Sequence, residues 1–413
     1  MYYPLTTMQR YYYDNQQRAP HSTMYNFCSS LVLLHDWVDL ERLSDVIAKI
    51  VDAYPAFCSL IEEHNGQPLQ RIVPGLIPTP PPIERITDAE FITLKDELIQ
   101  PFYPGEAMCR FRIFQTETAK YLFMDISHLI CDGLSEYVLC HALDSVYEGQ
   151  ELPSDSWLSY LQEEDAAKFS PHYEESRRYF EDRYNPEGFS RYPQPDFDSE
   201  GLSQGVSVFQ TGITAEELGI LRKCHVTHNG FFITAAMLAT ASFNHTPNVM
   251  HTWTYHGRNK KELHNTIGLM LKDLPVALSL EGMTIGQVFT SIREQVKGGL
   301  RHMDYPYELL NDKCLADDDL CIIYQGSLFS TPDKIKLFNK FTQFSSDSAA
   351  CENIFDADIR DTYGKIELVF SYAADRYKPQ TVEAYSDVFA RTARSLLGAM
   401  RNNRLDDEVM RYV

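Results

Sequence analysis

The residues most able to do chemistry lie within the segment 127–133, which reads Ser-His-Leu-Ile-Cys-Asp-Gly. The imidazole of His128 can take a proton from an attacking amine or hydroxyl near neutral pH. Asp132 follows His128 closely and Gly133 precedes a helical pattern, so we expect the imidazole and the free amides of a helix N-terminus to face one pocket. Such amides can stabilise an oxyanion as it develops. The segment therefore favours acyl transfer.

Each of these residues also has a plainer interpretation. A lone histidine is often hydrogen-bonded for structural reasons only. Asp132 can act simply as the cap of the helix that starts at Gly133, and Gly133 can serve only the turn. Cys131 is a conceivable thiol nucleophile beside His128, although a cysteine in a strand-to-helix loop is more often a small packing residue. Spacing alone leaves these alternatives open.

The strands and helices that position this segment are predicted from alternating strand-like and helix-like sequence patterns. Apolar alternation is clear in 108–115, where Cys109, Phe111 and Ile113 share one face. We expect an α/β lobe over residues 1–170. Its predicted elements are strands at 26–34, 67–73, 108–115 and 120–127, and helices at 39–54 and 134–147.

A second lobe is predicted over residues 171–413, including a Pro- and Gly-rich connecting segment near 184–205. Its order of elements loosely echoes the first lobe. The stretch 329–353 has little periodicity, and a loop that long is usually functional or mobile. The predicted elements are strands at 206–211, 249–255, 273–280, 320–325 and 365–372, and helices at 215–226, 230–243, 285–300 and from Pro379 onward.

Composition excludes several classes of partner. The chain carries 37 Lys and Arg against 58 Asp and Glu, a formal net charge of −21, and it has no basic run. Such a chain repels a phosphate backbone, so we expect no nucleic acid partner. The longest mostly apolar run, Phe231 to Phe243, is shorter than the ~20 residues of a membrane span, so we expect no membrane partner.

Cysteine usage and short motifs narrow the class further. The nine cysteines are odd in number and never spaced as Cys-x-x-Cys, which favours a reducing cytoplasm over a disulfide framework or a cysteine-based zinc site. The run 317–319, three aspartates, is more typical of a solvated acidic turn than of a cation site. The chain has no nucleotide-binding glycine motif and no Gly-x-Ser-x-Gly. We expect no metal site.

The segment 127–133 resembles the His-His-x-x-x-Asp-Gly motif of condensation domains of nonribosomal peptide synthetases, which belong to the superfamily that includes chloramphenicol acetyltransferase. Further similarities occur in the family's order over nearly the whole chain. They are Pro4-Leu5-Thr6 with Met8-Gln9, Tyr255-His256-Gly257-Arg258, Ile267-Gly268 with Leu274-Pro275, and His302 to Glu308 with its Asp304, the last of which we interpret as structural.

The resemblance implies a fold of two chloramphenicol acetyltransferase-like lobes in a V-shaped pseudodimer with a central tunnel. It implies an enzyme that forms an amide bond between a carrier-bound acyl or aminoacyl thioester and the amine of a carrier-bound aminoacyl acceptor. His128 would be the central catalytic residue, and Gly133 would let the donor thioester approach the backbone. Asp132 would be structural, paired with Arg258.

The resemblance also implies partners. Donor and acceptor carrier domains and neighbouring synthetase domains would meet this chain, which would bind no cofactor of its own because the carriers supply the phosphopantetheine arms. Because the similarity begins at Pro4, a starter type that uses a fatty-acyl donor is a further expectation.

Three departures from the family pattern matter. Ser127 replaces the first His of the motif, no Arg follows the first helix near Cys58, and Lys272-Asp273 replaces Asn-Thr. The Glu-Gly-His-Gly-Arg-Glu pattern of related epimerisation domains is 254–259 here, without either Glu, which disfavours epimerisation. These changes keep two alternatives open: acyl transfer to a free amine or alcohol, and a non-catalytic docking module.

Overall fold

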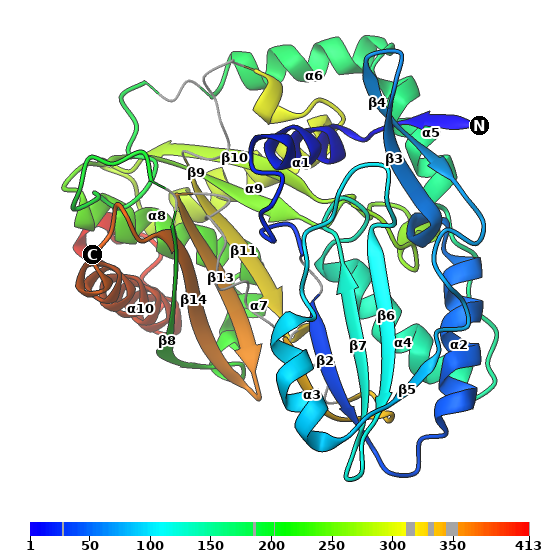
Figure 1. The fold of residues 1–413 in the computed structure, drawn as a ribbon. Coiled ribbons are helices and arrows are strands. Elements are labelled where there is room, and N and C mark those ends of the chain that lie inside the picture. The colour runs from blue at the N-terminus through cyan, green and yellow to red at the C-terminus, as the bar shows by residue number, and fades with distance from the viewer. Residues whose placement is uncertain are drawn as a thin grey trace. The chain divides into compact units, whose positions relative to one another are not determined.

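A computed structural model describes residues 1–26, 29–184, 187–201, 203–310, 319–328, 334–343 and 354–412, which form two compact units (Figure 1). The first unit contains the described residues of 1–166, 256–271 and 331–349. The second contains the described residues of 167–255, 272–330 and 350–413. We keep a two-lobe division near residue 170 as a proposal. The segment 256–271 and the described residues of 331–349, which the sequence analysis places in 171–413, lie in the first unit.

The first unit is built on a five-stranded sheet of order β12-β2-β7-β6-β5. One edge strand, β12, comes from much later in the chain than its neighbours and pairs antiparallel with β2. This pairing is long-range and leaves no periodic signal in the sequence, which explains why the sequence analysis predicts no strand there. The strands are β2 (Ser30–Leu34), β5 (Ile83–Arg85), β6 (Cys109–Gln115), β7 (Lys120–Ile126) and β12 (Phe338–Gln343).

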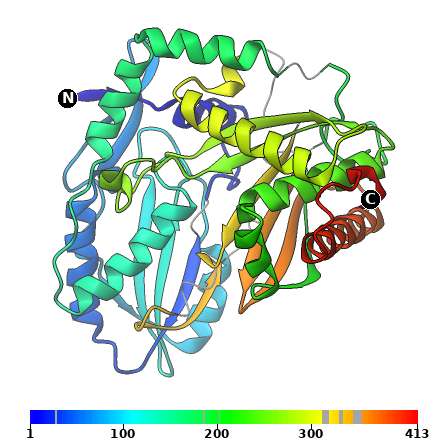
Figure 2. The same cartoon turned by 180° about the vertical axis from the view of Figure 1, so that it is seen from behind.

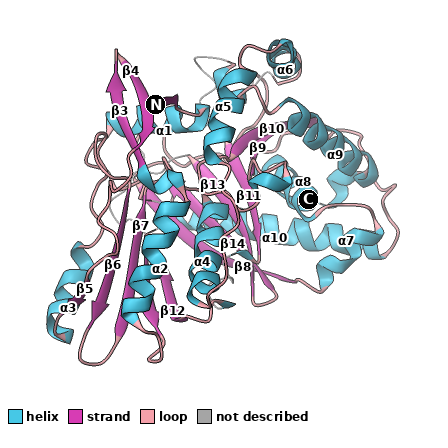
Figure 3. Cartoon of the chain, turned by 90° about the vertical axis from the view of Figure 1, so that its right-hand side faces the viewer, coloured by secondary structure: helices cyan, strands magenta, loops and turns pink. Residues whose placement is uncertain are grey.

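Helices cover both faces of this sheet (Figure 3). Helices α2 and α4 pack on one face, and α3 packs on the other, where Phe91 stacks on Tyr121 with ring centroids 4.1 Å apart. Helix α2 starts where predicted, because the Asp39 side chain accepts the Arg42 N–H. The helices of this unit are α1 (Thr7–Arg18), α2 (Leu40–Ala53), α3 (Asp88–Leu94), α4 (Gly133–Tyr147) and α5 (Trp157–Ala167).

A second, three-stranded sheet in this unit has the order β1-β4-β3. The sequence predicts only one of its strands, at 67–73. Asn65 and Gly66 both have positive φ, 54° and 77°, as in the two-residue hairpin turns whose twist suits flanking strands. The Asn-Gly pair is therefore the signal that identifies the strand before it. The strands are β1 (Tyr2–Pro4), β3 (Ser59–His64) and β4 (Gln67–Ile72).

The second unit is built on a six-stranded sheet of order β10-β9-β11-β13-β14-β8. Helices α8, α9 and α10 pack against this sheet, and all three lie in front of it in Figure 2. The unit's strands are β8 (Gln204–Thr214), β9 (Asn248–Tyr255), β10 (Lys272–Ser279), β11 (Leu320–Gly326), β13 (Phe355–Thr362) and β14 (Lys365–Ala373). Its helices are α6 (Pro171–Glu181), α7 (Ile220–Lys223), α8 (His228–Phe243), α9 (Ile285–His302) and α10 (Pro379–Arg401).

The core of the second unit explains why its long helices are easy to predict. In α10, Val382, Tyr385, Phe389 and Leu396 recur at helical spacing and are all buried. Helix α8 is buried almost along its length, consistent with an apolar run too short to span a membrane. In the part of the chain that the structure describes, no helix has the length and apolar character to cross a bilayer.

Candidate active site

The motif 127–133 forms the connection between β7 and α4, as the sequence predicts. The main chain at the end of β7 is held on both sides: the Ser127 N–H donates to the Met108 carbonyl at 2.9 Å, and the His128 N–H donates to the Tyr25 carbonyl at 2.7 Å. These bonds place His128 at the end of the strand. The connection is therefore held in place before its side chains are considered.

Ser127, which stands where the family motif has its first His, is fully buried. Its hydroxyl oxygen accepts the Leu129 N–H at 3.3 Å, a local turn that short hydroxyl side chains favour. The loop is thus supported by a serine, without an imidazole at this position.

His128 is held in a single tautomer. Its Nδ1 lies 2.8 Å from the Cys131 carbonyl oxygen, which can only accept a hydrogen bond, so Nδ1 carries the proton and Nε2 carries the lone pair. The residue is 6% exposed. Burial lowers the pKa of His128 below its usual value, although the hydrogen bond to Cys131 and the charge of Asp132 act in the opposite direction. The imidazole is therefore neutral, and able to accept a proton, at neutral pH.

Asp132 fulfils both of the roles that the sequence left open. Its Oδ1 accepts the Ser135 N–H at 2.9 Å and caps α4, while its Oδ2 accepts Nη1 of Arg258 at 2.7 Å. Burial alone would raise the pKa of the Asp132 carboxyl, but the charge of Arg258 and hydrogen bonds from Arg258, Met270 and Ser135 outweigh it and lower the pKa. The predicted pairing of Asp132 with Arg258 is confirmed.

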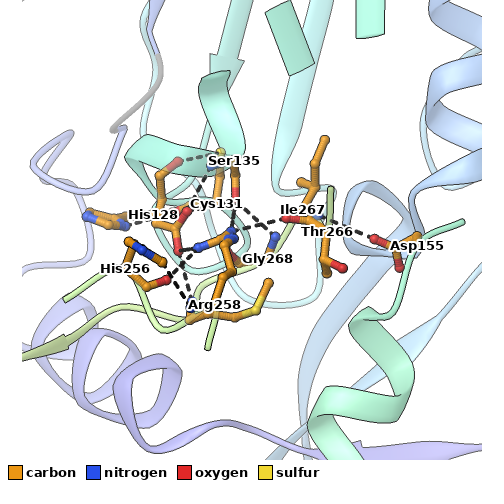
Figure 4. A network of polar contacts seen from close by, with 11 residues as sticks. His128, Cys131, Ser135, Asp155, His256, Arg258, Thr266, Ile267 and Gly268 are labelled. Carbon is orange, nitrogen blue, oxygen red and sulfur yellow. Dashed lines mark hydrogen bonds and ion pairs between the residues drawn. The ribbon is translucent and has the colours of Figure 1, made fainter. Parts of the chain in front are cut away.

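Arg258 is the centre of the polar network in Figure 4. Its side chain is fully buried, and Nη2 donates to the Ser135 hydroxyl at 2.8 Å and to the carbonyls of Thr266 and Gly268 at 3.1 and 3.2 Å. Nη1 also donates to the His256 carbonyl at 2.8 Å. The hydrogen bonds of one guanidinium therefore link the segment 256–271 to the start of α4.

Glycines allow this segment to pack closely. Gly257 has a φ of +74°, and a Cβ there would lie 1.8 Å from the Met270 carbonyl oxygen. At Gly268 a Cβ would lie 2.2 Å from the Trp157 ring. The Gly-Arg and Ile-Gly similarities in the sequence thus correspond to close approaches of main chain and ring.

Gln9 is a site residue to which the sequence analysis assigns no role. It is fully buried, and its Nε2 donates to the Leu129 carbonyl at 2.7 Å, directly after His128. Its Oε1 accepts Nε2 of Gln70 at 2.7 Å and the Thr6 N–H at 3.0 Å. The Thr6-x-x-Gln9 capping box was the available signal. Gln9 joins the N-terminus of α1 to the His128 loop.

Glu136 is a second residue that the sequence analysis does not single out. It lies in the first turn of α4, where the Ser30 hydroxyl donates to its Oε1 at 3.2 Å. Burial raises the pKa of Glu136 to about 7, against the lowering effect of the Ser30 hydrogen bond. A carboxyl that titrates near neutrality therefore lies one turn from Asp132.

The rival constellations do not form sites in the described structure. Cys131 is buried, and its carbonyl oxygen accepts the hydrogen bond from Nδ1 of His128. Asp317 and Asp318 lie outside the described residues; Asp319 is buried and paired with Arg191, so the expectation of a solvated turn is wrong for it. Among the described residues, no group of three or more His, Cys, Asp or Glu side chains is placed to hold a metal ion.

Two other segments with family similarity lie in the second unit. Asp273, at the altered Asn-Thr position, accepts a hydrogen bond from the Thr254 hydroxyl at 2.6 Å, and burial raises the pKa of its carboxyl. The Nδ1 atom of His302 lies 3.0 Å from the Ser176 hydroxyl, and its ring stacks on Tyr179 at 4.2 Å between centroids. The His302 contacts agree with a structural role.

The family model named Condensation domain matches residues 1–404 of this chain. The chain belongs to the condensation domain family. Condensation domains catalyse amide bond formation, an acyl transfer, in nonribosomal peptide synthetases, so the family and enzyme class predicted from the sequence are confirmed.

Curated relatives of this condensation domain are much longer proteins. Tyrocidine synthase 3 of Brevibacillus parabrevis is 22% identical over 80% of the chain, and gramicidin S synthase 2 of Aneurinibacillus migulanus is 22% identical over 96% of it. The chain spans 5% and 9% of the length of these two relatives.

Solved structures share the fold. The epimerization domain from the third module of tyrocidine synthetase B has a TM-score of 0.75 at 17% identity, with 98% of each chain covered. The first condensation domain of the calcium-dependent antibiotic synthetase, in complex with a substrate analogue, has a TM-score of 0.74 at 16% identity, with 99% of each covered. The starter condensation domain of rhizomide synthetase, in complex with C8-CoA, has a TM-score of 0.72 at 16% identity over 96% of this chain and 95% of that one. The predicted α/β fold, shared with condensation domains, is confirmed by these matches.

Proposed function

We propose that this condensation domain joins a carrier-bound acyl or aminoacyl thioester to the amine of a carrier-bound aminoacyl acceptor. The observation that carries the proposal is the hydrogen bond between Nδ1 of His128 and the Cys131 carbonyl, at 2.8 Å. It leaves Nε2 as a proton acceptor at a strand-to-helix junction in a chain of this family. This is the nitrogen that a general base would use.

In the proposed reaction, His128 takes up one proton and later returns it. The acceptor nitrogen attacks the thioester carbonyl, a C–N bond forms, and the nitrogen's proton moves to Nε2. The C–S bond then breaks, and the thiolate leaves with the proton returned by the imidazole. An α-amino group has a reference pKa of about 8, so the acceptor attacks in its uncharged form, and the neutral imidazole takes the single proton that the nitrogen loses as the C–N bond forms.

The start of α4 supports stabilisation of the oxyanion. Because Asp132 takes the Ser135 N–H, we assign the oxyanion to the amides of Gly133 and Leu134, which have no partner within a helix. Gly133 is half-buried and has no side chain, which would allow a thioester to approach the main chain. Asp132, Arg258 and Ser127 hold the loop and do not touch the reacting atoms in this proposal.

The proposed partners follow from the reaction. Donor and acceptor carrier domains would bring their substrates on phosphopantetheine arms, and neighbouring synthetase domains would hold them close, so the chain would need no cofactor of its own. We propose a cytoplasmic location, with neither nucleic acid nor membrane as a partner.

Replacement of His128 tests the proposal. His128→Ala is expected to lower turnover with both loaded carriers by about a hundredfold or more, the usual contribution of a general base. His64→Ala, at an exposed position of β3, is the matched control and is expected to keep wild-type turnover. Unchanged turnover of folded His128→Ala would overturn the role of the imidazole.

For the donor we propose a fatty-acyl thioester, as in a starter condensation domain. Fatty-acyl and aminoacyl donors would be offered in competition against one aminoacyl acceptor, and mass spectrometry would identify the product. Exclusive use of the aminoacyl donor would overturn the starter assignment and leave the condensation reaction intact.

A second candidate is acyl transfer to a free amine or alcohol. Asp273, hydrogen-bonded to Thr254 where the family has Asn-Thr, favours it, because any acceptor contact made by that Asn is altered. Products from carrier-bound and free acceptors separate the two: product from free acceptors only would overturn the leading proposal. Carrier binding without any product would favour a docking module instead.

A further inference from the structure

Three aromatic rings form a buried row that ends at the imidazole of His128. The ring of Tyr12, on α1, lies 4.7 Å from the His128 ring between centroids, with an interplanar angle of 48°. On its other side Tyr12 lies 4.9 Å from the ring of Tyr25. Tyr12 and Tyr25 are 3% and 2% exposed, so both rings are part of the interior. A tyrosine of the N-terminal helix therefore covers the imidazole.

The row of aromatic rings and the hydrogen bonds contact different parts of His128. The Tyr25 carbonyl accepts the His128 N–H at 2.7 Å and fixes the main chain. The Cys131 carbonyl accepts Nδ1–H at 2.8 Å and fixes one edge of the ring. The Tyr12 ring lies against the imidazole and occupies the space into which it would turn.

We infer that Tyr12 is a positioning residue, which keeps His128 in the orientation and tautomer that present Nε2 for catalysis. The inference rests on the proposed function of His128 and adds a residue from α1 to the site. Without the Tyr12 ring, only the hydrogen bond to the Cys131 carbonyl would oppose rotation of the imidazole about its Cβ–Cγ bond, the rotation that exchanges Nδ1 with Nε2. Small misplacements of a base cost as much as about a hundredfold in rate.

The Tyr12 ring also excludes water from the imidazole. Burial is the largest influence on the pKa of His128, and it lowers that pKa; the charge of Asp132 at the start of α4 raises it. Opening the Tyr12 position to water is therefore expected to move the pKa upward. A change in this direction would not follow from a general loss of stability elsewhere in α1.

The test compares Tyr12→Ala, Tyr12→Phe and Tyr13→Ala. Tyr13 is a buried tyrosine next to Tyr12 in the same helix, so Tyr13→Ala controls for loss of packing. Long-range ¹H–¹⁵N spectra of histidine-labelled protein report the tautomer and pKa of His128 without any substrate. Turnover with loaded carriers reports kcat and KM separately.

For Tyr12→Ala we expect a mixture of His128 tautomers, a higher pKa and a fall in kcat of about tenfold or more, with a smaller change in KM. Tyr12→Phe should restore the single tautomer and most of the turnover, since it keeps the ring. Tyr13→Ala should keep the wild-type tautomer and pKa.

The two proposals fail in different ways. A single, Nδ1-protonated tautomer with unchanged pKa in folded Tyr12→Ala would overturn the role of Tyr12, whatever the turnover. Wild-type turnover in His128→Ala would overturn the catalytic role of His128, whatever the spectra show. Equal effects of Tyr12→Ala and Tyr13→Ala on the imidazole would reduce Tyr12 to a packing residue.

Discussion

The Oδ2 atom of Asp132 accepts a hydrogen bond from Nη1 of Arg258 at 2.7 Å, and both side chains are buried. Asp132 belongs to the loop that carries His128, whereas Arg258 belongs to the segment 256–271, which joins β9 to β10 and packs into the first unit. This ion pair joins the loop that carries His128 to a part of the chain that is distant in sequence. Because it is buried, removing either partner leaves an unpaired charge in the interior.

A double-mutant cycle tests this pair. Asp132→Ala and Arg258→Ala are each expected to lower the free energy of unfolding by about 3 kcal/mol or more. The double variant should lose less than the sum, as expected for residues in contact. Denaturant unfolding measures all three variants. The exposed pair Arg10–Asp14, 2.8 Å apart, is the control and should show little coupling; strictly additive losses for Asp132 and Arg258 would contradict the interaction.

The pH dependence of turnover should show a base with a lowered pKa. Burial lowers the pKa of His128, so the imidazole stays neutral to a lower pH than an exposed histidine would. We expect kcat to rise with pH through this low pKa and to reach a plateau below pH 7. Repeating the profile with an acceptor amine of different pKa separates the two ionisations. If the acidic limb moves with the amine, it does not belong to His128.

A methyl group at Gly257 should disturb the segment that carries Arg258. Gly257→Ala brings a Cβ to within 1.8 Å of the Met270 carbonyl, in addition to the strain of a φ of +74°. Gly282 has a φ of +70° with open space around it, so Gly282→Ala isolates the cost of the backbone angle, about 1 kcal/mol. Gly257→Ala should cost more in thermal unfolding and lower turnover. Equal effects of the two substitutions would show that the close approach to Met270 is unimportant.

His251 should make the second unit sensitive to acid. It is fully buried on β9, neither ring nitrogen has a hydrogen-bond partner among the described residues, and burial lowers its pKa to about 3. An unfolded histidine has a pKa of about 6.5, so between pH 6.5 and 3 the unfolded state binds a proton that the folded state excludes. Stability is therefore expected to fall as pH decreases through this window, by at most about 1.4 kcal/mol per pH unit.

Unfolding measured from pH 7 to pH 4 checks the His251 prediction. His251→Leu should flatten the decline in stability, because the buried titrating group is gone. His64→Ala, at an exposed position, should leave the decline as it is in the wild type. A decline of the same slope in His251→Leu would assign it to other groups.

The sequence predicts those parts of the fold that depend on neighbouring residues. Asp39 starts α2, Pro379 lies at the start of α10, and the apolar face of α10 recurs at helical spacing, because caps and periodicity act over a few residues. The strands β1, β3, β5, β12 and β13 are not predicted. For β12, the partner strand β2 lies far away in the sequence, and pairing at that distance leaves no local pattern.

The candidate site divides in the same way. By itself the sequence determined that His128 follows a strand, that a helix begins at Gly133, and that the motifs resemble those of condensation domains. Only the tertiary structure decided that Asp132 both caps α4 and pairs with Arg258, that Gln9 bonds to the Leu129 carbonyl, and that Tyr12 covers the imidazole. The pKa of His128 depends on how completely water is excluded, and its imidazole ring lies against the Tyr12 ring of α1. Both arise only when α1, the loop after β7 and the segment 256–271 come together, because desolvation and long-range hydrogen bonds exist only in the packed state.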